Sequence, residues 1–356
     1  MDKIDTVSLY DGSVTKIKYS YSDNAPVDKL VIYVNGSGQN TYDNKRKNPK
    51  GGFFNYHDFF RNEFLSRNVA YCSYNTRGVD IGDSEPLFVT VDEDEYKKYK
   101  PLNSVRDIES IVRHLTKLPE FNNAKIFLLG WSEGTIVAPH VALRKNVRVD
   151  ALLLAGYCNE NMKDALIWQL SGNSSYVSLR KHFDKDKKGY ISKNDYDTAD
   201  PKIKADLLGN QPFEKIDSNS DGRIDISDFA ALQKPYLDSL LDAISRNDDE
   251  WLKTNYINPT IKLTTGWFNE HFSLAPTKSI LPQLDLPIHI FQGVDDAACP
   301  LKYAEDIRDD FLKRGKTNLT VNIFADHNHD LNFFEWLLQG TIPIGIKCIF
   351  DTVDAM

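Results

Sequence analysis

Ser132 is the residue of this sequence best suited to act as a nucleophile. It stands in Gly-Trp-Ser-Glu-Gly at residues 130–134, between an apolar run at 124–129 and a segment at 135–143 that can begin a helix. A strand that passes through a tight turn into a helix presents a serine hydroxyl at the edge of a sheet. Glycines suit both flanks, because the serine backbone is strained and strand and helix must approach closely. We predict a nucleophile here; the alternative is an ordinary serine in a glycine-bracketed turn.

An activated serine needs a histidine as base, and the histidine needs a carboxylate that orients it. In strand–turn–helix sites these groups follow one another along the chain in the order serine, acid, histidine. The acid is expected directly after the apolar run that ends at Gly293, where Asp295 and Asp296 both qualify. Asp296 is favoured because it gives a Gly-x-x-Asp pattern followed by Pro300, and Asp295 remains the alternative.

The histidine is expected in the loop after the last strand. Residues 326–331 read Asp-His-Asn-His-Asp-Leu and offer two candidates. His329 is favoured because it directly precedes the run into the last helix, and His327 is the alternative. An isolated histidine is more often structural, but here its place follows from the chain order of the other groups.

A glycine-rich loop supplies the remaining part of such a site. Residues 30–34 form the continuous apolar run of a buried parallel strand, and Asn-Gly-Ser-Gly follows at 35–38. A loop in this position supplies one backbone donor for the oxyanion, and the residue after the nucleophile supplies the other. We assign these donors to Ser37 and Glu133; the alternative is a plain connection between strand and helix.

The elements that position these residues alternate along the chain. We predict a hairpin at residues 7–21, further strands at 69–74, 150–156, 286–293 and 319–324, and helices at 53–67, 104–117, 301–314 and about 331–338. This alternation indicates an α/β protein with a mostly parallel, doubly wound sheet. The alternation stops before residue 286, which indicates an insertion over the carboxyl-terminal edge of the sheet, where such folds bind ligands.

Taken together, these residues resemble an α/β-hydrolase. The sequence is more narrowly similar to a bacterial esterase-like branch of that superfamily, over residues 28–170 and 265–340. The branch shows Gly-Ser-Gly with a polar loop, then Arg-Gly-Val and Gly-x-Ser, then a nucleophile followed by Glu-Gly. The corresponding residues here are Gly36-Ser37-Gly38 with Asp43, Arg77-Gly78-Val79 with Gly82-Asp83-Ser84, and Ser132-Glu133-Gly134.

The resemblance has two departures and one main implication. Trp131 precedes the nucleophile where this branch usually has histidine, and Asp80 and Ile81 are extra residues after the Arg-Gly-Val motif. Neither departure removes a catalytic group, but both count against a close match in substrate. The resemblance implies hydrolysis of carboxylic esters or thioesters without a cofactor for the chemistry.

The insertion, residues 158–275, forms a predicted helical cap between two parts of the hydrolase core, 1–157 and 276–356. Within it, residues 217–228 have the spacing of a calcium-binding loop of the EF-hand type. Calcium takes oxygen ligands, and this spacing gathers them around one point. The expected ligands are Asp217, Asn219, Asp221, the carbonyl of Arg223, Asp225 and Asp228.

A second, weaker loop at residues 184–195 completes the predicted EF-hand pair. Lys188 stands at its fifth position, where an ammonium cannot ligate a cation, so we expect weak binding or none. Both loops end in aspartate, whose shorter side chain should lower the affinity for calcium. A dockerin-like module is less favoured, because the pair is internal to the chain. The candidate ligands of the weaker loop are Asp184, Asp186, Tyr190, Ser192 and Asp195.

Composition limits the partners. The formal net charge of −8 gives no reason to expect nucleic acid or an anionic membrane surface. No apolar stretch is long enough to span a bilayer, and the N-terminal residues lack the core of a signal peptide. We therefore expect a cytoplasmic protein; a secreted protein whose signal has been removed is the alternative. The four cysteines show no metal spacing, which predicts free thiols.

The function expected from the sequence is that of a serine hydrolase on a small-molecule ester or thioester, with calcium bound in the cap. Calcium would either gate the cap or serve as a permanent structural staple, and the staple is favoured. A serine peptidase or amidase is the alternative among enzymes. A calcium-responsive binding protein on a silent hydrolase scaffold is the alternative of another class.

Overall fold

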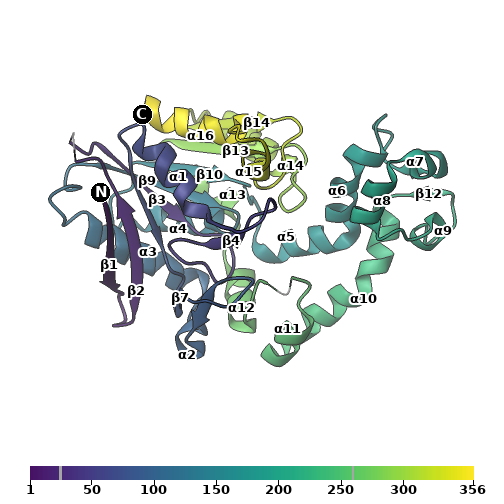
Figure 1. The fold of residues 1–356 in the computed structure, drawn as a ribbon, viewed down its shortest axis with the longest axis horizontal. Coiled ribbons are helices and arrows are strands. Elements are labelled where there is room, and N and C mark those ends of the chain that lie inside the picture. The colour runs from purple at the N-terminus through teal and green to yellow at the C-terminus, as the bar shows by residue number, and fades with distance from the viewer. Residues whose placement is uncertain (24–25, 259) are drawn as a thin grey trace.

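A single sheet forms the centre of the computed structural model, which describes residues 1–23, 26–258 and 260–356 (Figure 1). Its strands are β1 (Asp2–Ser8), β2 (Val14–Ser20), β3 (Lys29–Val34), β6 (Ala70–Tyr74), β9 (Lys125–Trp131), β10 (Ala151–Ala155), β13 (Ile288–Gly293) and β14 (Leu319–Phe324). Their order in the sheet is β1-β2-β6-β3-β9-β10-β13-β14. The pairs β1–β2 and β2–β6 are antiparallel, and every later pair is parallel. The predicted N-terminal hairpin and mostly parallel sheet are confirmed.

Helices cover both faces of this sheet. One face carries α1 (Tyr56–Leu65), α15 (Phe333–Gln339) and α16 (Ile344–Ala355), and the other carries α3 (Pro101–Leu115), α4 (Gly134–Arg144) and α14 (Leu301–Lys313). Strand β9 shows why two layers form. Ile126 and Leu128 pack into one hydrophobic cluster, and Phe127 and Leu129 pack into the other. Both faces of the strand are buried, as its continuous apolar run predicts.

The C-terminal helix corrects the sequence analysis, which expected the last helix at about residues 331–338. A further helix, α16, follows α15, and its buried residues include Ile346, Ile349 and Phe350. These side chains join the cluster that α1 packs against, so α16 covers sheet surface that would otherwise face water. Among the described residues no single helix meets the length and apolarity of a membrane span; α15 and α16 meet them only jointly, across a bend of 108°.

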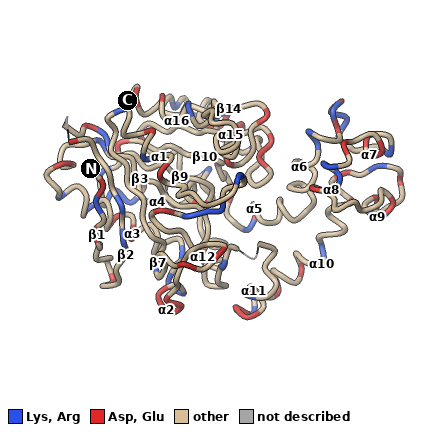
Figure 2. The backbone as a smooth tube through the Cα atoms, viewed as in Figure 1, with Lys and Arg blue, Asp and Glu red and all other residues tan. Residues whose placement is uncertain are grey.

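Short elements fill the connections of the core. They are the strand pairs β4 (Lys45–Lys47) with β5 (Phe53–Asn55) and β7 (Val79–Ile81) with β8 (Val89–Val91), and the helices α2 (Glu93–Tyr96), α13 (Thr277–Ile280) and η2 (Leu281–Gln283). All four cysteines are free thiols, as expected. Basic and acidic residues both occur along the core and the insertion (Figure 2).

The insertion between β10 and β13 has two parts. The part next to the sheet consists of α5 (Met162–Trp168), a kinked turn η1 (Gln169–Asn173), the later half of α10 (Ile226–Ser245), α11 (Asp249–Asn255) and α12 (Thr265–Ser273). The other part, here called the projecting lobe (residues 174–230), extends away from the sheet (Figure 1). It contains α6 (Ser174–Phe183), β11 (Ile191–Ser192), α7 (Lys193–Thr198), α8 (Pro201–Leu208), α9 (Phe213–Ile216), β12 (Arg223–Ile224) and the start of α10.

The projecting lobe has a small hydrophobic core of its own. Phe183, Ile191, Phe213, Ile224 and Phe229 are buried together in it, apart from the clusters that flank the sheet. The lobe begins just after Gly172, where an added Cβ would lie 2.2 Å from the Ile226 carbonyl oxygen. A residue with a side chain would not fit there, so Gly172 allows the segment before α6 to pack closely against the start of α10.

Candidate active site

Ser132 occupies a strained turn between β9 and α4. Its φ of +55° lies in the left-handed region, which costs energy for a residue with a side chain. An added Cβ on Gly130 would lie 2.4 Å from the Gly134 carbonyl oxygen, and one on Gly134 would lie 2.2 Å from the Val34 carbonyl oxygen. Both positions therefore require glycine, for the steric reason that the Gly-x-Ser-x-Gly pattern suggested. The turn directs Ser132 into a cavity at the carboxyl ends of the strands.

The structure brings Asp296 and His329 together in the loops after β13 and β14. The Nδ1 atom of His329 lies 2.9 Å from Oδ2 and 3.0 Å from Oδ1 of Asp296. The Asp296 side chain is buried, and its Oδ1 also accepts the backbone N–H groups of Ala298 (2.8 Å) and Cys299 (2.7 Å). These contacts fix the direction of the carboxylate.

His329 is positioned by its surroundings as well as by Asp296. Its backbone carbonyl accepts a hydrogen bond of 3.2 Å from Trp131 Nε1, and its ring lies against Gly156, where an added Cβ would come within 2.7 Å. Burial disfavours the imidazolium, but the adjacent Asp296 carboxylate outweighs burial and raises the pKa of His329 to about 9. His329 and Ser132 line the same cavity; among the described residues no hydrogen bond joins them, and such bonds tighten when substrate binds.

The alternative acid and base take other partners. Asp295 accepts hydrogen bonds on Oδ1 from Arg180, at 3.0 Å from Nη2 and 3.3 Å from Nε. His327 donates from Nδ1 to the Ala325 carbonyl (2.7 Å), and its Nε2 accepts the backbone N–H of Gly345 (3.3 Å). Because both ring nitrogens of His327 are engaged, it anchors the start of α16 and has no free nitrogen for a serine.

Ser37 and Glu133 line the same cavity as Ser132. Within the described part of the chain, the N–H groups of Ser37 and Glu133 donate to no protein acceptor, so both are free to bind an oxyanion. The cavity has a volume of about 470 Å³. Apolar side chains of the cap form much of its wall, and they include Met162, Leu166, Ile261, Leu263, Trp267 and Phe268. Arg46 and Asp330 add one charge of each sign to the wall.

Sequence reasoning missed the residues that support this site. Gln292 is fully buried, and its Nε2 donates to Asp296 Oδ2 (2.9 Å) and to the Cys299 carbonyl (2.8 Å). A glutamine directly after the apolar residues Ile290 and Phe291 of a buried strand was a usable signal for it. The Glu133 side chain also has three buried partners, Tyr99, Trp267 and His271. No sequence signal pointed to these, since the partners lie up to 138 residues away.

Comparison with solved structures gives the fold. Est1E from Butyrivibrio proteoclasticus aligns with 99% of this chain and 96% of its own, at 12% identity and a TM-score of 0.50. A lipase in its open form aligns over 100% of both chains, at 11% identity and a TM-score of 0.51. The acylaminoacyl peptidase of Pyrococcus horikoshii covers 100% of this chain with 40% of its own, at 11% identity and a TM-score of 0.50. This chain has the α/β-hydrolase fold. No protein-family model and no curated protein sequence matches it.

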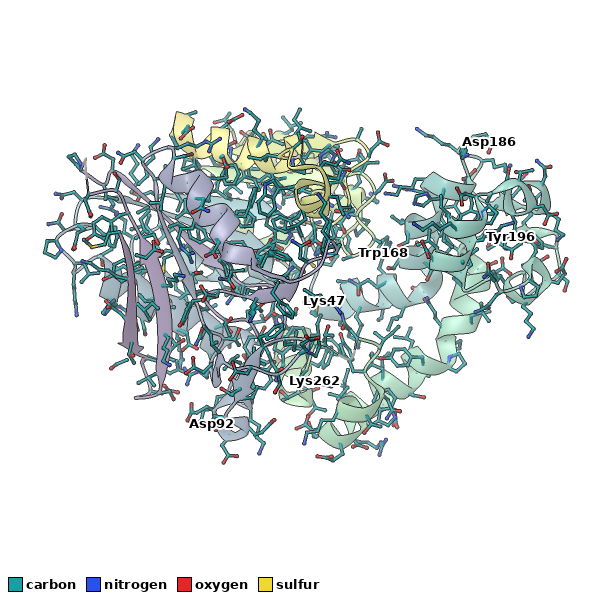
Figure 3. All side chains as sticks on the ribbon, in the orientation of Figure 1. Lys47, Asp92, Trp168, Asp186, Tyr196 and Lys262 are labelled. Atoms are coloured by element: carbon teal, nitrogen blue, oxygen red, sulfur yellow. The ribbon has the colours of Figure 1, made fainter. Side chains whose placement is uncertain are left out.

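The two acidic loops, residues 184–195 and 217–228, lie in the projecting lobe, and Figure 3 labels Asp186 of the first loop. The loops share one backbone path. The fourth residues, Lys187 and Ser220, have φ values of +56° and +59°, and the sixth residues, both glycine, also have positive φ. At the eighth positions, Ile191 and Ile224 pair across β11 and β12. The loops are therefore a structurally matched pair.

The two loops share the contacts of their first aspartate and differ at the fifth position. Asp217 accepts backbone N–H groups on both carboxylate oxygens, from Asp221 (3.1 Å) and Gly222 (2.9 Å), and Asp184 accepts them in the same way from Lys188 and Gly189 (2.9 Å each). In the first loop the Lys188 ammonium lies 2.6 Å from Asp195 and 3.3 Å from Asp186, where a cation would otherwise bind. Among the described residues no group of three or more histidine, cysteine, aspartate or glutamate side chains is arranged to hold a metal ion. Calcium binding therefore stays a prediction.

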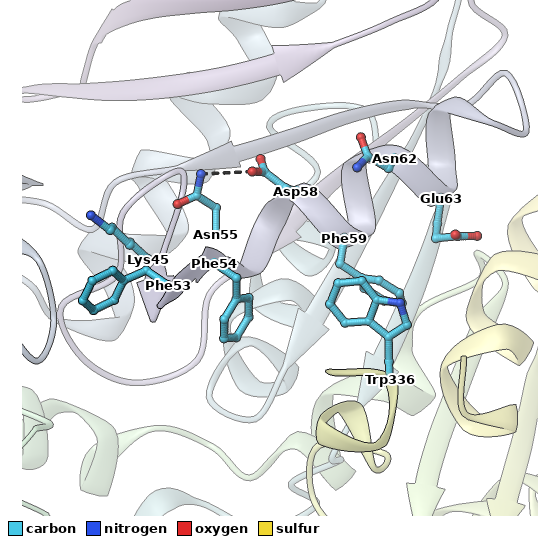
Figure 4. A pocket seen from close by; sticks show the side chains of 9 residues that line it. All are labelled: Lys45, Phe53, Phe54, Asn55, Asp58, Phe59, Asn62, Glu63 and Trp336. Carbon is cyan, nitrogen blue, oxygen red and sulfur yellow. Dashed lines mark hydrogen bonds between the residues drawn. The ribbon is translucent and has the colours of Figure 1, made fainter. Parts of the chain in front are cut away.

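A second hollow lies between α1 and α15, on the outside of the core (Figure 4). Its volume is about 430 Å³, and its wall includes Phe53, Phe59 and Trp336. Asn55 donates to Asp58 at its rim (3.0 Å). Its lining includes none of the predicted catalytic groups.

Proposed function

We propose that this protein is a serine hydrolase that cleaves a carboxylic ester or thioester. The observation that carries the proposal is the hydrogen-bonded pair of Asp296 and His329, in a cavity shared with the strained Ser132 and two free amide donors. A nucleophile, an oriented base and an oxyanion site are the three parts that acyl transfer requires.

The proposed reaction has two steps. His329 takes the hydroxyl proton of Ser132 while Oγ attacks the substrate carbonyl, and the Ser37 and Glu133 amides bind the resulting oxyanion. The tetrahedral intermediate expels the alcohol or thiol, which receives the proton from His329, and leaves an acyl-enzyme. Water then attacks the acyl-enzyme with His329 again as base, which releases the acid and restores Ser132. Asp296 keeps the imidazole in the tautomer that this sequence needs.

A carboxylic ester or thioester is favoured over an amide on two grounds. The resemblance of the sequence is to an esterase-like branch, and two of the three structural neighbours named above are Est1E and a lipase, while the third is a peptidase. Much of the cavity wall is apolar and would suit an acyl chain. A peptidase or amidase would use the same groups against a poorer leaving group, so it remains the second candidate among enzymes.

We also propose that the second acidic loop binds calcium. Asp217, Asn219, Asp221, the Arg223 carbonyl, Asp225 and Asp228 would hold the ion, which has the chemistry of a hard cation with oxygen donors. Bound calcium would order the projecting lobe and takes no part in the acyl transfer. The first loop, with Asp184, Asp186, Tyr190, Ser192 and Asp195, would bind weakly, since Lys188 already supplies a positive charge.

Hydrolysis of p-nitrophenyl esters across acyl lengths tests the function, with wild type and Ser132→Ala compared in calcium and in chelator. Loss of the nucleophile should lower kcat by several orders of magnitude, about 10⁴-fold or more. A fluorophosphonate probe should label wild type and not the variant. A wild type that hydrolyses no ester and takes no label would overturn the proposal and favour a calcium-responsive binding protein.

A further inference from the structure

The carboxylate of Glu133 is buried beside the nucleophile, and the proposed mechanism uses only its backbone N–H. The residue is 2% exposed. Its Oε1 accepts hydrogen bonds from Trp267 Nε1 (3.0 Å) and His271 Nε2 (2.9 Å), and its Oε2 accepts one from the Tyr99 hydroxyl (2.6 Å). A buried carboxylate is stable only when donors replace its water, and three donors do so here.

The three donors come from the cap and from the core. Trp267 and His271 lie one turn apart on cap helix α12, while Tyr99 belongs to the core, between α2 and α3. All three are buried. The side chain next to Ser132 therefore joins the cap to the core, and the cap cannot move off the cavity without breaking two of these hydrogen bonds.

Tyr99 also reaches the loop that carries the other oxyanion donor. The backbone N–H of Gly38 donates a hydrogen bond to the Tyr99 hydroxyl at 3.3 Å, and that hydroxyl in turn donates a hydrogen bond to Glu133 Oε2. Gly38 directly follows Ser37. On its other side Gly38 packs against Ile261 of the cap, whose Cγ2 lies 3.4 Å from the place of an added Cβ. One chain of hydrogen bonds thus runs from the Ser37 loop to residue 133.

We propose that Tyr99 and the Glu133 carboxylate are positioning residues of the oxyanion hole, with α12 as their anchor in the cap. They act through the Ser37 and Glu133 amides, and the inference therefore rests on the proposed serine-hydrolase function. Donors stabilise an oxyanion strongly only when they are already fixed where the charge will develop. The network fixes both donors relative to each other, because one carboxylate holds residue 133 directly and the Ser37 loop through Tyr99.

Tyr99→Phe tests this, with Tyr96→Phe as the matched control. Both rings are buried and stack on each other with centroids 5.5 Å apart. The Tyr96 hydroxyl donates to the Lys262 carbonyl, outside the network. Each variant thus removes one buried hydroxyl from the same aromatic pair, and a general loss of packing would affect both alike. Glu133→Gln extends the test, because an amide accepts hydrogen bonds on only one of its two terminal atoms.

Tyr99→Phe should lower kcat for a short p-nitrophenyl ester roughly 10-fold with little change in KM, since the network acts on the transition state. The inhibition constant of a boronic acid, which forms a tetrahedral adduct with the serine, should rise by the same factor. Tyr96→Phe should leave both near wild type. Equal effects of the two variants, or a change in KM alone, would overturn the inference.

Hydrogen–deuterium exchange of the peptide over residues 36–40 gives a readout that needs no catalysis. Exchange should be faster in Tyr99→Phe than in wild type and unchanged in Tyr96→Phe, because Gly38 loses its acceptor. Unchanged exchange in Tyr99→Phe would count against the inference even if the rate fell. A wild type that neither hydrolyses esters nor binds the boronic acid would instead refute the proposed function, and the exchange result would still decide whether Tyr99 holds the loop.

Discussion

Arg180 of the projecting lobe is hydrogen-bonded to Asp295, the residue beside the proposed catalytic acid. Its Nη2 donates to Asp295 Oδ1 (3.0 Å) and to the Val294 carbonyl (2.6 Å). Gln169 of η1 makes a second contact, from Nε2 to the Ala298 carbonyl (2.9 Å). The cap thus touches the acid loop on both sides of Asp296. The Arg180 side chain is 34% exposed, however, so its ion pair contributes little energy on its own.

Gln292 should matter more than Arg180 for the rate. Gln292 is buried and donates to Asp296 Oδ2, so Gln292→Ala leaves that oxygen with His329 as its remaining partner and should lower kcat about 10- to 100-fold. Arg180→Ala leaves every bond of Asp296 intact and should change kcat by less than about 3-fold. Steady-state kinetics on one ester compares the two. A larger loss in Arg180→Ala would mean that the lobe sets the acid's position.

The pH dependence should follow His329. Its pKa of about 9 means that the imidazole is protonated at neutral pH, while general-base catalysis needs the neutral ring. The value of kcat/KM should therefore rise with pH up to about 9. Asp296→Asn removes the carboxylate that raises the pKa, so the rising limb should move to lower pH while the maximum falls about 10⁴-fold. A limb that stays in place in Asp296→Asn would contradict this assignment.

The strands and helices of the core could be predicted because the apolar patterns that indicate them lie within short stretches of sequence. The run through Ser132, the strand that ends at Gly293 and the loop that carries His329 each follow from periodicity and chain order. The choice between Asp295 and Asp296 rested on spacing, and the structure separates them by partners, Arg180 for one and His329 for the other. No local pattern specifies such partners.

The contacts that the sequence could not predict are those between segments that lie far apart along the chain. Trp267 and His271 approach Glu133 only after the insertion has folded back over the sheet, and α16 is placed by an apolar face that the core leaves open. The Arg-Gly motif at residues 77–78 carries no chemistry that its sequence alone would predict. Its packing shows a structural reason, since an added Cβ on Gly78 would lie 2.5 Å from the Tyr96 backbone nitrogen.

Arg77→Ala should destabilise the fold by about 3–5 kcal/mol, because it leaves a buried carboxylate without its partner. Arg77 is 3% exposed and binds Asp107 through Nη2 (2.5 Å) and Nε (3.0 Å). Burial already raises the pKa of Asp107 to about 6 despite Arg77. Loss of the Arg77 guanidinium raises the pKa of Asp107 further, so at pH 8 the unfolded chain gains more by ionising this carboxyl than it does at pH 5. The loss in the urea unfolding free energy should therefore be larger at pH 8.

Arg113→Ala is the control for this prediction. Its guanidinium lies 3.3 Å from Glu109 and its side chain is 45% exposed, so its removal should cost less than about 1 kcal/mol. The double variant Arg77→Ala/Asp107→Asn should regain part of the stability, since no buried charge remains. Equal losses in Arg77→Ala and Arg113→Ala would show that burial of the Asp107 pair carries no special weight.

Calcium should stabilise the protein without changing its rate. At about 100 times its dissociation constant, calcium should add about 2.7 kcal/mol to the unfolding free energy, and chelator should remove that gain. Asp221→Ala should abolish the shift, because it removes a ligand of the second loop, while Asp186→Ala in the Lys188-filled loop should retain it. Thermal melting and the ester rate are measured together. An ester rate that rises with calcium would show that calcium gates access to the cavity through the lobe. An unfolding free energy of wild type that calcium does not change would mean that the loops bind no calcium.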